Sequence, residues 1–113
     1  MTRFALAALI AFAPLTASAD VTAFCKVLPG TNAAQCACAT EKLRTQVSGT
    51  DFALYDAVGT GYLKNRSTGQ GWLAAWRASV KTVAAQNGIE LTAFKSRLDR
   101  IGDIHRAIGD TCK

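Results

Sequence analysis

Four cysteines constrain this 113-residue chain more than any other feature, because an even number of cysteines in an oxidising compartment predicts a framework of disulfides. They are Cys25, Cys36, Cys38 and Cys112. On a helix, Cys36 and Cys38 lie about 200° apart around the axis, so each needs a different partner. We therefore expect two disulfides, which join these two cysteines separately to Cys25 and Cys112.

Helical spacing bears on which pairing forms. Cys36 falls in a predicted buried stripe that continues at spacings of four, three and four residues, whereas Cys38 falls among polar residues. On this basis we favour Cys36 with Cys112 and Cys25 with Cys38. The swapped pairing stays open, because Cys25 in an antiparallel helical hairpin could reach either cysteine.

Residues 1–19 have the features of a cleaved secretory signal peptide. Arg3 precedes an uncharged apolar run over 4–13, Pro14 ends that run, and Ala17-Ser18-Ala19 forms a small-residue cleavage site before Asp20. A run of this length is about half of what a membrane-spanning helix needs. We expect export to the periplasm or secretion, a mature chain of 20–113, and no transmembrane segment after cleavage.

The mature chain is predicted to be entirely helical. Apolar residues recur with the helical period in five segments, which are separated by Pro29-Gly30, Ser48-Gly49, the polar stretch 67–71 and Asn87-Gly88. Asn32 with Gln35 resembles a capping box at the start of the second segment. The clearest segment has a seam stepping by three and four, made of Leu91, Phe94, Leu98, Ile101, His105, Ile108 and Cys112. We expect one all-α domain over 20–113, a small disulfide-stapled bundle of four longer helices plus a short N-terminal helix.

Two pairs of residues in the middle segments bear on packing. Gly59 and Gly61 interrupt the third helix, and we expect them to allow either close contact with a neighbouring helix or a local kink. A phosphate-binding loop is not expected, because no strand precedes them. Trp72 and Trp76 share one face of the fourth helix, and we expect both to pack in the core. The alternative is an exposed aromatic patch that contacts a partner or a membrane surface.

His105, the only histidine, lies in the apolar seam of the last helix, where a buried imidazole needs a polar partner. No carboxylate lies three or four residues away, so nothing on its own helix would orient it as a base. Gly102 and Gly109 leave room beside the ring for another helix or a small ligand. We expect a structural histidine that Gln replaces better than Leu, and we name Gly102, His105 and Gly109 as a candidate pocket.

The charged residues favour surface contacts over catalysis. The 13 basic and 8 acidic residues give a modest basic excess, and no nucleic-acid-binding motif is present, so no nucleic acid is expected. Asp99 and Asp103 are predicted to lie on a solvated face rather than to bind a metal. Four basic residues are candidates for a cluster between the third and fourth helices that contacts an anionic surface, namely Lys64, Arg66, Arg77 and Lys81.

The sequence thus predicts a binding or accessory protein. No nucleophile with a neighbouring base, metal-ligand cluster or cofactor motif is recognisable, so we expect no catalytic residue, no metal and no cofactor. The partner is expected to be a protein or a small ligand. The alternative is a thiol-redox or copper-handling role for Cys36 and Cys38, because two soft sulfurs can bind Cu(I).

Overall fold

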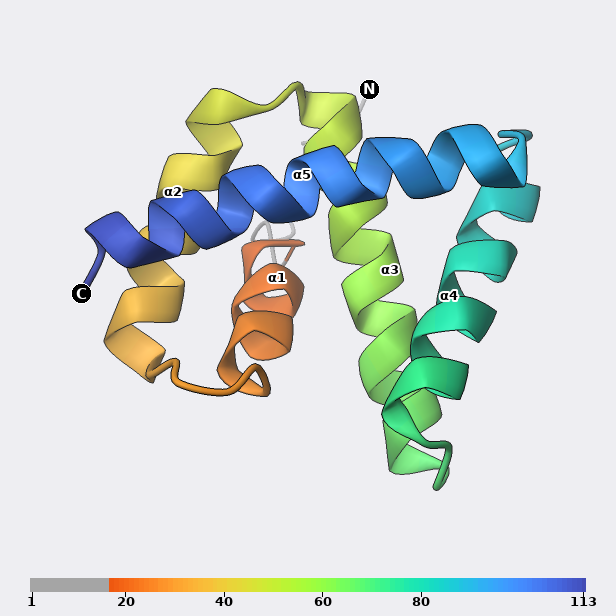
Figure 1. Cartoon of the computed structure of the whole chain (residues 1–113), viewed down its shortest axis with the longest axis horizontal. Coiled ribbons are helices and arrows are strands. Elements are labelled where there is room, and N and C mark those ends of the chain that lie inside the picture. Colours follow the sequence, from red (N-terminus) through yellow and green to blue (C-terminus); the bar gives the residue numbers. More distant parts are fainter. Residues whose placement is uncertain (1–16) are drawn as a thin grey trace, which may run out of the picture.

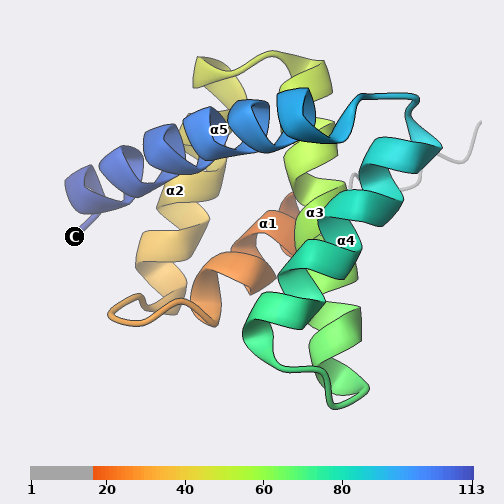
Figure 2. The same ribbon diagram turned by 45° about the vertical axis from the view of Figure 1, so that its right-hand side comes forward.

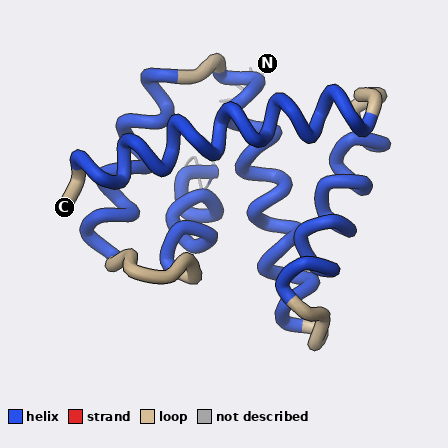
Figure 3. The backbone as a smooth tube through the Cα atoms, in the orientation of Figure 1, coloured by secondary structure: helices blue, strands red, loops and turns tan. Residues whose placement is uncertain are grey.

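Five α-helices joined by short loops make up the computed structural model over the residues that it describes, 17–113 (Figures 1 and 3). The helices are α1 (Ala17–Lys26), α2 (Ala33–Gln46), α3 (Gly49–Ser67), α4 (Trp72–Gln86) and α5 (Leu91–Thr111). Residues 17–113 contain no strand. The predicted all-α bundle of one short and four longer helices is confirmed. The expected signal peptide falls outside the described residues, except for its last three positions.

The helices form two antiparallel hairpins beneath a long crossing helix. The C-terminal half of α5 crosses the α1–α2 side of the molecule, and its N-terminal half crosses the α3–α4 side. The loop between α2 and α3 lies on the opposite side of α5 from the α3–α4 turn (Figures 1 and 2). α1 packs against both α2 and α3, so it joins the two hairpins. The largest fully buried side chains come from all five helices and include Val21, Leu43, Val58, Val80 and Phe94. Removing these apolar side chains from water is the main force that holds the helices together.

Local hydrogen bonds explain where the helices begin. The Asn32 side chain accepts a hydrogen bond from the Gln35 amide (2.9 Å), and the Ser48 hydroxyl accepts one from the Asp51 amide (3.0 Å). The Glu90 carboxylate accepts hydrogen bonds from the backbone amides of Thr92 and Ala93 in the first turn of α5, and these bonds lower the pKa of Glu90. Each cap satisfies amides that have no partner inside the helix. The second half of the expected capping box is absent, because the Gln35 side chain has a different partner.

Two disulfides tie both neighbouring helices to α2. Cys25 of α1 is bonded to Cys36, and Cys38 is bonded to Cys112, which directly follows α5. The favoured pairing of Cys36 with Cys112 and of Cys25 with Cys38 is therefore wrong, and the swapped pairing is present. Cys36 is fully buried, as its stripe predicts. The error lies in which helix covers that stripe.

α1 packs on the buried side of α2, and the end of α5 lies along its more exposed side. Thr22 of α1 and Thr40 share a hydrogen bond of 2.8 Å on the buried side. On the other side of α2, the side-chain Nε2 of Gln35 donates a hydrogen bond to the Gly109 carbonyl of α5 at 2.9 Å. Helical spacing identifies the buried face of α2, but only the tertiary arrangement decides which neighbour lies against it.

Gly59 and Gly61 lie at close helix contacts, as expected. A Cβ atom at Gly59 would lie 3.2 Å from the Phe24 Cβ of α1, and one at Gly61 would overlap the Ser79 hydroxyl of α4. The Ser79 hydroxyl donates to the Val58 carbonyl at 2.7 Å. α3 therefore approaches α1 and α4 more closely than a larger residue at either glycine would allow.

The two tryptophans have different environments. Trp76 is partly buried and stacks on Phe24, with ring centroids 5.5 Å apart. Trp72 is 65% exposed, so the expectation that it packs in the core is wrong. Trp72 is the first residue of α4 and directly follows the turn that joins it to α3, so it lies at the tip of the hairpin. The helical period places Trp72 on the inner face, but nothing covers that face at the tip.

Candidate functional site

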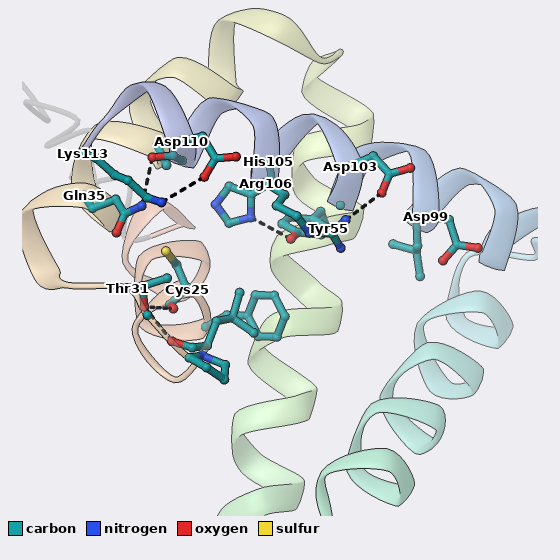
Figure 4. Close-up of a pocket in the computed structure, with 18 of the residues that line it drawn as sticks. Cys25, Thr31, Gln35, Tyr55, Asp99, Asp103, His105, Arg106, Asp110 and Lys113 are labelled. Carbon is teal, nitrogen blue, oxygen red and sulfur yellow. Dashed lines mark hydrogen bonds and ion pairs between the residues drawn. The ribbon is translucent and has the colours of Figure 1, made fainter.

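A cavity of about 760 Å³ lies between α5 on one side and the end of α1 with its following loop on the other (Figure 4). Gly102, His105 and Gly109, which the sequence singles out, all lie in its α5 wall. The opposite wall is formed by residues that sequence reasoning did not find, namely Phe24, Cys25, Leu28, Pro29, Gly30 and Thr31. Gln35, Ala39, Tyr55 and Trp76 complete the lining from the other helices.

The opposite wall has a local cause. The Thr31 hydroxyl donates to the carbonyls of Cys25 and Leu28, both at 2.8 Å, and so folds the loop back onto the end of α1. Gly30 adopts a φ of +77°, which the turn requires and which most other residues avoid. The Pro29-Gly30 turn is visible in the sequence. Its place opposite His105 is not, because it depends on the disulfide from Cys25 to α2.

His105 is buried and has a polar partner on another helix. Its Nδ1 lies 2.8 Å from the hydroxyl oxygen of Tyr55 on α3. Burial raises the pKa of Tyr55 far above its ordinary value and lowers that of His105, so both groups are neutral near pH 7. The hydrogen bond is best satisfied when the tyrosine hydroxyl donates to Nδ1. We therefore assign the imidazole proton to Nε2.

The Nε2 atom of His105 has no partner. It is buried and is the one side-chain nitrogen or oxygen within 20–113 that is buried without a hydrogen bond. Native proteins pair the large majority of such atoms, and leaving one unpaired costs about 1 to 3 kcal/mol. In Figure 4 the ring lies between Tyr55 on one side and the Gln35 end of the cavity on the other. A hydrogen-bond acceptor in the cavity would complete the bonding of the ring.

Charged residues of α5 and the C-terminus surround the cavity mouth. Arg106 pairs with Asp103 at 3.3 Å, and Lys113 pairs with Asp110 at 3.4 Å. Asp99 also lines the mouth, and it is in no ion pair within the described range. The two pairs cancel, so the mouth carries one excess negative charge. Asp99 and Asp103 are both exposed, in agreement with the solvated face that the sequence predicts.

The sulfur atoms and carboxylates do not form a second site. All four cysteines are disulfide-bonded, so Cys36 and Cys38 carry no free thiol. Within 17–113 no group of three histidines, cysteines or carboxylates is arranged to hold a metal ion. None of the helices in that range is long and apolar enough to cross a membrane.

Comparison with known proteins finds no similar sequence or structure. No protein-family model matches the chain, and the searches of curated proteins and of solved structures give no match either. The function must therefore be argued from the cavity and the surface of this structure.

Replacing His105 with leucine should destabilise the protein by about 1 to 3 kcal/mol relative to asparagine, because leucine leaves the Tyr55 hydroxyl buried without a partner. The side-chain amide of asparagine lies near the position of Nδ1, so it can retain that bond. Glutamine, the replacement that the sequence favours, reaches instead towards the position of Nε2. Thermal melts of the His105→Asn, His105→Gln and His105→Leu variants measure the difference. Combining His105→Leu with Tyr55→Phe should be clearly less than additive, and an additive loss would contradict the bond.

The pH dependence of the stability distinguishes a contribution of the His105 imidazole from one that comes only from packing. Burial lowers the pKa of folded His105 below 6.5, so its contribution to stability is complete above about pH 6.5 and is lost as the pH falls through that value. Burial raises the pKa of Asp56 to about 6, so its contribution is largest at low pH and declines as the pH rises from 3.8 towards 6. Both His105→Asn and the wild type retain Asp56, so the effect of Asp56 cancels when the two proteins are compared. The difference in their free energies of unfolding should therefore narrow below pH 6.5, where the wild type loses the contribution of His105.

Proposed function

We propose that this chain is an exported, periplasmic ligand-binding protein, and that its cavity holds a neutral, mainly apolar molecule with one hydrogen-bond acceptor. The observation that carries the proposal is that His105 lines the cavity while its buried Nε2 has no hydrogen-bond partner. Cavities that bind small molecules typically combine apolar walls with a few placed polar groups. An unpaired donor in such a wall favours binding over a purely structural role for the histidine.

The chemistry of the ligand follows from the walls and the mouth. Phe24, Leu28, Pro29 and Trp76 supply apolar and aromatic surface. The neutral Nε2–H group is a single donor, so it suits a carbonyl, amide or ether oxygen. The excess negative charge at the mouth disfavours carboxylates and phosphates. A neutral ligand with a ring or chain and a carbonyl fits these conditions best.

Export is supported by the leader pattern of residues 1–19 and by the two disulfides, which persist in the periplasm and are rare in the cytosol. A disulfide framework also disfavours the thiol-redox and copper-handling alternative, because Cys36 and Cys38 are bonded to different partners rather than to each other. Mass spectrometry of the protein recovered from the periplasm tests the first point, and a chain that begins at Asp20 is the expected result.

Binding can be tested with two matched fluorescent probes. Prodan is a neutral naphthalene with a carbonyl group, and dimethylaminonaphthalene is the same ring system without it. We expect Prodan to bind about fivefold more tightly, which corresponds to one net hydrogen bond. His105→Asn keeps the Tyr55 bond but removes the atom that would face the ligand, so this advantage should disappear. His105→Gln should retain part of it.

The outcomes are distinguishable from loss of folding. The probe that lacks the carbonyl should bind the wild type and the His105→Asn variant equally, and this equality is the control for an intact cavity. If neither probe binds the wild type, or if the advantage of Prodan survives in His105→Asn, the proposed function is wrong. Nitrogen chemical shifts of His105 add an independent readout, because they report whether Nε2 carries the proton.

A further inference from the structure

The stretch 57–89, which contains the later part of α3 and all of α4, holds the entire net charge of the predicted mature chain. Residues 57–89 contain four basic residues and no acidic residue, whereas the remainder of 20–113 contains eight of each. The four are Lys64, Arg66, Arg77 and Lys81, and all are exposed. None of them is in an ion pair within residues 17–113. This stretch is therefore a purely cationic arm, and the rest of the predicted mature chain has no net charge. Asp51 and Asp56 belong to the first part of α3, at the end of that helix away from the tip.

The tip of this arm also exposes apolar side chains. Trp72 is 65% exposed and Leu73 is 42% exposed, and both follow the turn at 68–71. The Arg66 guanidinium donates to the Gln70 carbonyl at 2.9 Å, which holds a cation beside them. A tryptophan next to a leucine and an arginine is the combination that favours the boundary between lipid headgroups and acyl chains.

The arm is free to meet a flat surface. In both ribbon views the turn between α3 and α4 projects beyond the other helices (Figures 1 and 2). Trp72 and the four basic residues do not line the cavity at α5. Contact at the tip would therefore leave that cavity open, and the inference below does not depend on the proposed ligand.

We infer that the α3–α4 hairpin docks on the surface of an anionic phospholipid bilayer. Trp72 and Leu73 enter the boundary between the headgroups and the acyl chains, and Lys64, Arg66 and Arg77 lie further out, beside the lipid phosphates. Basic residues close to an anionic membrane are each attracted to it, and this attraction falls off within a Debye length, about 8 Å at physiological salt. An acidic protein would match the charge equally well, but it would give no reason for the exposed tryptophan and leucine at the tip.

Vesicle binding tests the inference on the exported chain, purified with its disulfides intact. The vesicles are phosphatidylcholine alone, or phosphatidylcholine with about a third phosphatidylglycerol. We expect at least tenfold tighter binding to the anionic vesicles at low salt, release at high salt, and a blue shift of tryptophan emission. The shift should be absent in Trp72→Phe, which retains Trp76 as the background fluorophore.

A charge-matched pair of variants locates the contact. Lys64→Gln with Arg66→Gln should weaken binding to anionic vesicles at least tenfold. Lys95→Gln with Arg100→Gln removes the same charge from exposed positions on α5 and should change it less than threefold. Equal weakening by both variants, equal binding to both kinds of vesicle, or an unshifted Trp72 would each overturn the inference. Binding to polyglutamate without binding to vesicles would overturn it in favour of an acidic protein partner.

Discussion

Replacing both Cys38 and Cys112 with alanine should lower the free energy of unfolding by about 4.5 kcal/mol, the largest loss that we expect from any change in this chain. The bond between them spans 74 residues, so it removes much of the freedom of the unfolded chain. The Cys25–Cys36 bond spans only 11 residues. Replacing Cys25 and Cys36 with alanine should therefore lower the free energy of unfolding by less, about 3 kcal/mol. A domain of this size buries too little surface to tolerate either loss easily.

Urea unfolding of the two double variants measures this difference, and the variants are matched because each removes one disulfide by two cysteine-to-alanine substitutions. A larger loss on removal of Cys25 and Cys36 would contradict the expectation. The pairing itself needs a protease that cuts at Ala37, because trypsin leaves Cys36 and Cys38 on one peptide, 27–42. A non-reduced fragment that joins Cys38 to Cys112 is the expected result.

The second large effect concerns Gly61, where alanine should destabilise the protein by about 2 kcal/mol. The new methyl group would overlap the Ser79 hydroxyl, which cannot turn away without losing its bond to the Val58 carbonyl. This cost exceeds the gain of about 1 kcal/mol that alanine brings to a helix interior. Chemical denaturation of Gly61→Ala should therefore show a lower midpoint than that of the wild type.

Two further variants test whether the loss in Gly61→Ala comes from overlap of the new methyl group with the Ser79 hydroxyl. Gly102→Ala in α5 has no atom within 4 Å of its new Cβ, so it should show only the helix-propensity gain and stabilise the protein. Ser79→Ala should recover part of the loss when it is combined with Gly61→Ala, because the overlapping oxygen is then gone. If Gly61→Ala is as stable as Gly102→Ala, the close approach of α3 and α4 is wrong.

The helices were predictable from sequence because their signals are local. The Pro29-Gly30 turn, the Asn32 cap, the Ser48-Gly49 break and the three-four seam of α5 each lie within a few residues of the boundary or face that they define. The contact at Gly61 was predictable for the same reason, since a glycine inside a helix indicates a close neighbour. The identity of that neighbour, Ser79, was not.

Errors arose wherever the answer depended on which helices meet. The stripe of Cys36 is buried as expected, but it is covered by α1 rather than by the end of α5, and this reversed the disulfides. Trp72 has the right helical phase for the core, but it is exposed because it lies at the tip of the α3–α4 hairpin, away from the other helices. One wall of the cavity was predictable from the two glycines beside His105. The other wall was not, because it forms only when the loop after α1 folds back onto the end of that helix.

Cys36 and Cys38, two residues apart on α2, anchor both sides of the cavity. One bond holds α1, with the loop that follows it, and the other holds the last turn of α5. The spacing of the walls is therefore set when the chain is oxidised, before any ligand arrives. Binding to such a pre-organised cavity requires little further ordering of the backbone, so a single hydrogen bond and a modest apolar contact can be expressed almost fully as affinity.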